Sequence, residues 1–163
     1  MFLFYGFSGS IDFQSMLNKL KENKFKIFAA IIAVIGFALI RTFENKLFYD
    51  PFLVYFTADF HSIPYPEVNI FKLFTGLFFR YFLNSALSLL LIYALFQNRD
   101  IFKFSLLMYA FFLVVLLSSF FIILYFIPDA GWLLFYVRRF IIQPILVLLF
   151  IPGFYYQLQK TKK

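Results

Sequence analysis

Four long apolar stretches dominate the order of hydrophobic and polar positions along the chain. They are separated by short groups that are rich in charge, proline or glycine. A transmembrane helix needs about 20 consecutive apolar residues, and each stretch is close to that length or longer. The pattern therefore predicts an all-α integral membrane protein with about four transmembrane helices in a bundle. The predicted spans cover about residues 24–43, 70–97, 101–127 and 132–157.

The connections between these spans differ in character. Residues 98–100 and 128–131 have the composition of tight turns. Residues 42–69 carry acids and prolines but also the apolar run PFLVYFTADF, which predicts an interfacial segment lying on the outer face between the first two helices. Within the fourth span, Pro144 and Pro152 are expected to kink the helix, because proline removes a backbone donor.

The beginning of the chain does not follow the pattern of the spans. Residues 1–15 lack a basic region before their apolar run and a small-residue cleavage site after it, so they are a poor signal peptide. A lysine-rich stretch of conventional type starts at Met16. We expect residues 1–15 to be an N-terminal extension upstream of the native start, and residues 16–163 to form a single transmembrane domain.

Composition agrees with a membrane protein. Of 163 residues, 63% are hydrophobic and 14% are charged, and the mean hydropathy is +0.86. The chain has no cysteine, which excludes thiol nucleophiles, disulfide exchange and thiolate metal sites. The net charge of +7 comes from basic residues at the ends of the spans, where they meet lipid headgroups, so we expect no binding to nucleic acid.

Charge also predicts the orientation. With both termini in the cytoplasm, nine of the 15 basic residues lie inside and six lie outside or in the outer half of the membrane. Five of the eight acids lie outside in the same arrangement. The positive-inside rule favours this topology.

Three arginines lie inside predicted spans, and all three fall in the outer half. Arg80 lies about 15 Å along the second helix, and Arg138 and Arg139 lie about 10 Å along the fourth, at 1.5 Å per residue. Arg80 recurs with Asn84 and Ser88 at four-residue spacing, and Arg139 with Gln143, so both arginines lie on polar stripes suited to a bundle interior. The candidate residues for binding a partner or an anion are Arg80, Asn84, Arg138, Arg139 and Gln143.

Several groups are suitable partners for these arginines. A guanidinium binds planar oxyanions bidentately, so a lipid phosphate, a substrate carboxylate or an acid of the same chain would fit. Snorkelling to outer headgroups is the alternative. The acids expected on the outer side are Glu44, Asp50, Asp59, Glu67 and Asp129.

Other chemistry is poorly supported by the sequence. His61 is the single histidine, and Ser118 and Ser119 lie in the middle of a span that has no base. No glycine-rich phosphate loop is present. We expect no catalytic residue, no cofactor and no metal site. An intramembrane enzyme would require His61 to act together with an outer carboxylate.

The strings FKIFAAIIAVIGFALIRTFENKLFYDPFLVYF, FFRYFLNSALSLLLIYALF and RRFIIQPILVLLFIPGFYYQ carry a resemblance to a known family. Over about residues 16–156 the chain resembles the exosortase F system-associated proteins, which are small multi-span proteins encoded beside a membrane sortase-like protease in Gram-negative bacteria. The resemblance implies a bacterial inner-membrane location and an exosortase as membrane protein partner. The exosortase is expected to use a cysteine, so the chain resembles the companion and not the protease.

The prediction from sequence is thus a non-catalytic accessory membrane subunit that assists membrane protein sorting or processing. The alternative is a small lipid-handling or transport protein that binds an anionic headgroup through its outer-leaflet arginines. Membrane lipids are expected partners in both cases.

Overall fold

The computed structural model describes residue 14, residues 17–18 and residues 22–162. Apart from Gln14, the predicted extension 1–15 and its boundary at Met16 lie outside the described residues. The described part contains six helices and no strand, so the predicted all-α fold class is confirmed. The helices are α2 (Lys24–Leu47), α3 (Phe52–Tyr55), α4 (Ile70–Phe96), α5 (Arg99–Phe126), α6 (Gly131–Ile142) and α7 (Ile145–Thr161).

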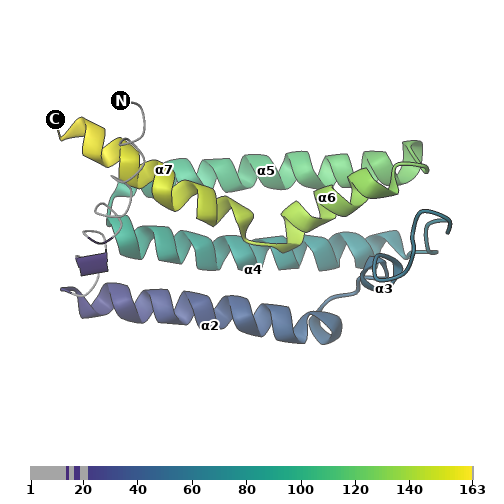
Figure 1. Ribbon diagram of the computed structural model, residues 1–163, viewed down its shortest axis with the longest axis horizontal. Helices are drawn as coiled ribbons and strands as arrows, with labels where there is room; N and C mark the ends of the chain where they lie inside the picture. Colours follow the sequence, from purple (N-terminus) through teal and green to yellow (C-terminus); the bar gives the residue numbers. More distant parts are fainter. Residues whose placement is uncertain (1–13, 15–16, 19–21, 163) are drawn as a thin grey trace, which may run out of the picture.

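The long helices lie side by side in one bundle (Figure 1). Helices α2, α4 and α5 are each long and apolar enough to cross a membrane. Helices α6 and α7 pass the same test only as a pair, which is bent by 62° at the break, as in a broken span or a re-entrant loop. The arrangement is therefore that of a multi-pass membrane bundle, with three helices of spanning length and a bent helix pair. We call the end of the bundle that carries residues 48–69 and 127–130 the loop end.

Asparagine side chains fix the starts of the three long helices. Asn23, Asn69 and Asn98 each precede a helix, and each accepts a hydrogen bond from a backbone N–H of its first turn. These caps satisfy donors that have no partner within the helix. The observed helix starts at 24, 70 and 99 accordingly lie within two residues of the predicted ones.

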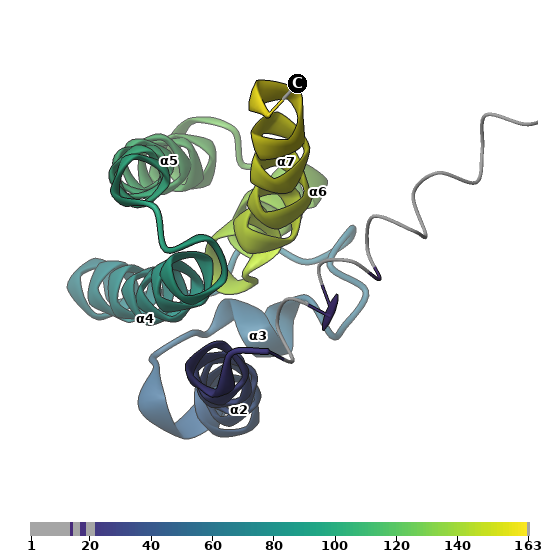
Figure 2. The ribbon, with the colours of Figure 1, turned by 90° about the vertical axis from the view of Figure 1, so that its left-hand side faces the viewer.

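Helix α4 is the centre of the bundle. Half of its most apolar window is buried, compared with 11% for α2, which packs chiefly against α4. Viewed along the helices, α2 lies on one side of α4, and α5 and α7 lie on the other (Figure 2). A residue on an inward side of α4 is therefore covered by neighbouring helices.

Small residues let α2 approach α4 closely. Ala29 and Ala33 are buried on the face of α2 that meets α4. A Cβ added to Gly36 would lie 2.7 Å from a methyl carbon of Leu87 on α4, which is too close. Membrane helices associate through such small-residue contacts, because lipid supplies no hydrophobic drive for helices to pair. This stripe continues along α2 toward Glu44.

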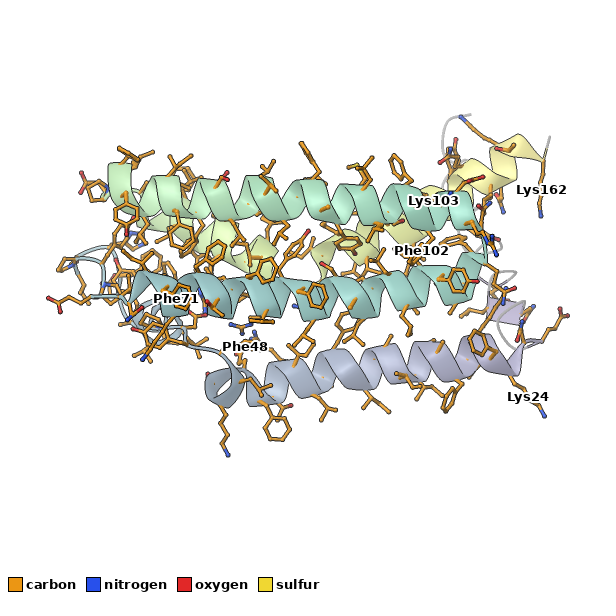
Figure 3. All side chains as sticks on the ribbon, turned by 180° about the vertical axis from the view of Figure 1, so that it is seen from behind. Lys24, Phe48, Phe71, Phe102, Lys103 and Lys162 are labelled. Carbon is orange, nitrogen blue, oxygen red and sulfur yellow. The ribbon has the colours of Figure 1, made fainter. Side chains whose placement is uncertain are left out.

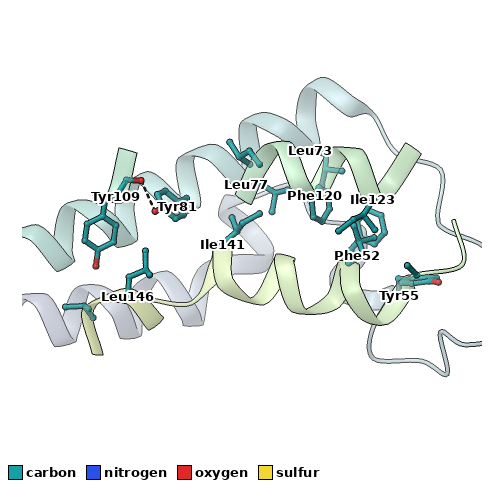
Figure 4. Close-up of a cluster of buried hydrophobic side chains, with 14 of the residues drawn as sticks. Phe52, Tyr55, Leu73, Leu77, Tyr81, Tyr109, Phe120, Ile123, Ile141 and Leu146 are labelled. Carbon is teal, nitrogen blue, oxygen red and sulfur yellow. Dashed lines mark hydrogen bonds between the residues drawn. The ribbon is translucent and has the colours of Figure 1, made fainter. Parts of the chain in front are cut away.

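One buried apolar cluster runs along the bundle from α3 at the loop end to α7, and it holds α3, α4, α5, α6 and α7 together. The fully buried Phe52 of α3 meets Phe120 of α5 edge to face, with ring centroids 5.7 Å apart (Figure 4). Leu73 and Leu77 of α4 and Ile141 of α6 are buried in the same cluster. The segment 42–69 was predicted to be interfacial, but its first residues, up to Leu47, belong to α2, and its remaining part inserts the side chain of Phe52 into the bundle.

Of the two prolines expected to kink the fourth span, one separates two helices and the other does not. Helix α6 ends at Ile142 and α7 begins at Ile145, directly after Pro144. Helix α7 continues through Pro152. Pro144 has no N–H to donate and its ring crowds the preceding turn, which accounts for the break there.

Candidate functional site

Two of the three intramembrane arginines meet two carboxylates inside the bundle. Arg80 of α4 donates to Asp50 Oδ2 through Nη1 over 3.1 Å, and it donates to Glu44 of α2 through Nη2. Arg138 of α6 donates to both oxygens of Asp50, with Nε 3.1 Å from Oδ2 and 3.3 Å from Oδ1. We call these four residues the arginine–carboxylate cluster. It joins α2, α4, α6 and the segment between α2 and α3.

The cluster is shielded from its surroundings. The side chains of Arg80, Asp50 and Arg138 are 2%, 4% and 5% exposed. The ring of Phe48 lies 5.6 Å from the Arg80 guanidinium carbon, and the ring of Phe56 lies 5.8 Å from that of Arg138. Aromatic faces attract such cations. The exposed Arg41, one turn before Glu44 on α2, adds a further ion pair to Glu44 over 3.4 Å.

The charges of the cluster cancel, because two guanidinium groups face two carboxylates. An unpaired charge in a nonpolar interior is costly, whereas a paired and hydrogen-bonded one is tolerated. Arg80 Nε is buried without a hydrogen-bond partner among the described residues. The geometry makes Asp50 the shared acceptor on which the cluster depends.

A glycine on α4 allows Asp50 to reach this position. A Cβ added to Gly76 would lie 2.8 Å from the carbonyl oxygen of Tyr49, the residue before Asp50. Any other residue at 76 would therefore push the backbone of Tyr49 away. Gly76 lies one turn before Arg80, and the two positions together seat the 48–51 segment against α4.

Asn84 has a structural contact one turn further along α4. Its Nδ2 donates to the carbonyl oxygen of Ile142 over 2.9 Å, at the break between α6 and α7. That carbonyl is one of those left without a helical partner by the interruption at Pro144. Ser88, on the same stripe, donates to the carbonyl of Asn84 over 2.7 Å. The stripe Arg80–Asn84–Ser88 faces the bundle interior and stabilises the broken helix.

Arg139 lies apart from the cluster. It is exposed on α6, and its Nε donates to Gln143 Oε1 over 3.1 Å. Among the described residues no carboxylate lies within ion-pair distance of its guanidinium. The two adjacent arginines of α6 therefore point to different environments.

The remaining acids expected as partners lie elsewhere. Asp59, Glu67 and Asp129 are exposed residues of the loop end, away from the cluster. The sequence does not show which two of the five outer acids pair with the arginines. The prediction from sequence also missed Phe48, Phe56 and Gly76, although the four-residue spacing from Gly76 to Arg80 was a usable signal.

His61 lies at a shallow hollow of about 400 Å³ at the loop end, together with Tyr65, Asp129 and Trp132. Its ring stacks on Phe60 at 4.5 Å. Nearby, burial raises the pKa values of Tyr55 and Tyr65, and the Tyr55 hydroxyl donates to the carbonyls of Phe60 and Ile63. Within the described ranges no three metal-ligating side chains come together.

The site thus defines a membrane-type helical bundle with an internal, charge-balanced ion cluster and, beside it on α6, the exposed Arg139. Comparison with protein-family models, with curated proteins and with solved structures finds no match for this chain.

Proposed function

We propose that this protein is a non-catalytic accessory subunit of a membrane protein sorting or processing system of the exosortase type. One observation carries the proposal: Arg80 and Arg138 are paired with carboxylates of their own chain. A group that is already neutralised and buried is suited to holding helices together. It is poorly suited to capturing a ligand or acting on a substrate.

The same observation favours a subunit over the lipid-handling alternative. A lipid phosphate would have to displace Asp50 from two guanidinium groups and then leave that carboxylate buried and unpaired. Breaking a buried pair in this way costs about 3–5 kcal/mol. Arg139 alone remains available from the three arginines on which the alternative depends.

The proposal includes a bacterial inner membrane with both termini in the cytoplasm. Lys24, Lys103 and Lys162 gather at the end of the bundle opposite the loop end (Figure 3). An excess of lysine and arginine at one end supports placing that end in the cytoplasm. A green fluorescent protein fused after Lys163 is expected to fluoresce, and its failure to do so while alkaline phosphatase at the same place is active would contradict the orientation.

The test of the function is purification of the tagged full-length protein from its native host in a mild detergent, followed by quantitative mass spectrometry. The control is an unrelated tagged multi-span protein from the same host. Recovery of an exosortase-type protease at near-equal stoichiometry is the expected result. Recovery of only a tightly held anionic lipid would favour the alternative, and recovery of nothing beyond the control would contradict the proposal.

A further inference from the structure

The outward side of α6 presents a charge that the protein itself does not neutralise. Five residues share this side: Trp132, Tyr136, Arg139, Phe140 and Gln143. At 100° per residue they fall within about 100° of arc, whereas the buried Leu134, Arg138 and Ile141 lie on the other side. We call these five residues the outward face of α6.

Arg139 lies deep along the helix. It is eight residues after Gly131, which places it about 12 Å along α6 from the loop end at 1.5 Å per residue. The hydrocarbon core of a bilayer is about 30 Å thick, so in a helix that enters it at Gly131 this position lies within the outer leaflet. Charged residues at such depth normally face a bundle interior and pair with another group.

The direction of the Arg139 side chain argues against a headgroup as its partner. A helical side chain leans toward the N-terminus of its helix, and the N-terminus of α6 lies at the loop end. The Arg139 side chain could therefore extend to headgroups at that surface in its preferred direction. Its Nε instead donates to Gln143, which lies one turn deeper at the break before α7. The Nε edge of the guanidinium is therefore held toward Gln143, one turn further along the chain, and not toward the nearer surface.

An anion that reaches Arg139 in this orientation must itself lie within the membrane. A second copy of this chain is a poor source of that anion. Among the acids of the described spanning helices, Glu44 is paired with Arg80, and Asp100 lies in the first turn of α5 at the opposite end. The described helices of a second copy thus offer no free carboxylate at the required depth.

We infer that the outward face of α6 is the docking surface for a transmembrane helix of a different protein, which contributes an aspartate or glutamate to Arg139. The aromatic residues Trp132, Tyr136 and Phe140 flank that charge and supply apolar contact area. Aromatic residues and arginine are the types that carry most binding energy at protein interfaces. The inference rests on the proposed function, since it names where the partner of that subunit binds.

The test uses the full-length protein in its host with a photo-crosslinking amino acid, p-benzoylphenylalanine, at Phe140. The matched control places it at Val114, which is 65% exposed on α5. A crosslink to another membrane protein is expected from position 140 and not from 114. The crosslinked peptide is expected to carry an aspartate or glutamate within about one helical turn of the adduct.

A charge variant completes the test. Arg139→Gln is expected to reduce co-purification of the crosslinked protein by roughly 30-fold or more, because the partner's carboxylate is left buried and unpaired. Arg139→Lys is expected to retain most of the co-purification. The control Lys72→Gln, which removes an exposed charge from the first turn of α4, is expected to retain most of it as well. All variants are first checked for unchanged elution in size-exclusion chromatography.

The outcomes separate this inference from the proposed function. If a partner protein co-purifies but crosslinks equally from 114, or is unaffected by Arg139→Gln, the inference is wrong and the subunit function stands. Crosslinking of position 140 to a second copy of this chain overturns it as well. A phospholipid that is lost on Arg139→Gln, with no protein captured, contradicts both.

Discussion

Replacing Asp50 tests whether the arginine–carboxylate cluster holds the bundle together. The carboxylate of Asp50 accepts from both Arg80 and Arg138, and its side chain is only 4% exposed. In Asp50→Asn the side chain keeps its size but loses its charge. Arg80 retains Glu44, whereas Arg138 retains no carboxylate among the described residues.

The expected loss of stability follows from that geometry. Removing one partner of a buried ion pair costs about 3–5 kcal/mol, because the other charge remains buried. Asp50→Asn and Arg138→Gln should each fall in this range. The double variant should be less destabilised than the sum of the two by at least about 2 kcal/mol, since it leaves no uncompensated charge.

The assay is reversible unfolding by sodium dodecyl sulfate in mixed micelles, followed by the fluorescence of Trp132. Trp132 is the single tryptophan, and it lies on α6 six residues before Arg138. Asp59→Asn serves as the control, because Asp59 is exposed in the loop and should change stability by no more than about 0.5 kcal/mol. If Asp50→Asn also stayed within that limit, the cluster would not be a stabilising element and the reasoning would be refuted.

Three further substitutions test separate parts of the structure. Gly76→Ala should destabilise the protein by about 1–3 kcal/mol, because the added Cβ meets the backbone of Tyr49. In the control Gly153→Ala the added Cβ meets nothing within 4 Å, so the substitution should be neutral or stabilise by up to about 1 kcal/mol. Equal effects in the same unfolding assay would refute the close-approach argument. Asn84→Leu should cost about 1–3 kcal/mol by leaving the carbonyl of Ile142 without its donor, and an unchanged midpoint would show that the contact contributes nothing. Arg139→Gln should change stability by no more than about 0.5 kcal/mol, because the residue is exposed, and a loss of several kcal/mol would mean that it is structural.

The periodic and compositional features of the chain predicted its helices well. The long apolar runs predicted the starts of α4 and α5 within two residues. Helix α2 extends to Leu47, four residues beyond the predicted end, because Glu44 faces α4 and not solvent. A charge at the end of an apolar run suggests a loop, and only a partner elsewhere in the fold shows that it belongs to the helix.

The partners of the arginines could not be chosen from the sequence, because they depend on the path of a loop. Asp50 reaches Arg80 across 30 positions, since Gly76 admits the backbone of Tyr49 and Phe52 anchors the following turn in the core. The spacing of Gly76 and Arg80 places them on one face of α4, but no motif shows which loop residue packs there. The acids closer to Arg80 or Arg138 in sequence, such as Glu67 and Asp129, lie exposed in the loops.

Three arginines that are equivalent by type and depth take two different roles once the fold is known. Arg138 and Arg139 are adjacent, so a rotation of about 100° around α6 directs one toward Asp50 and the other outward. The pairing inside the bundle neutralises the first, whereas the second is exposed and has no carboxylate within ion-pair distance among the described residues. This contrast between the two arginines supports the proposed contact of a second protein with the outward face of α6.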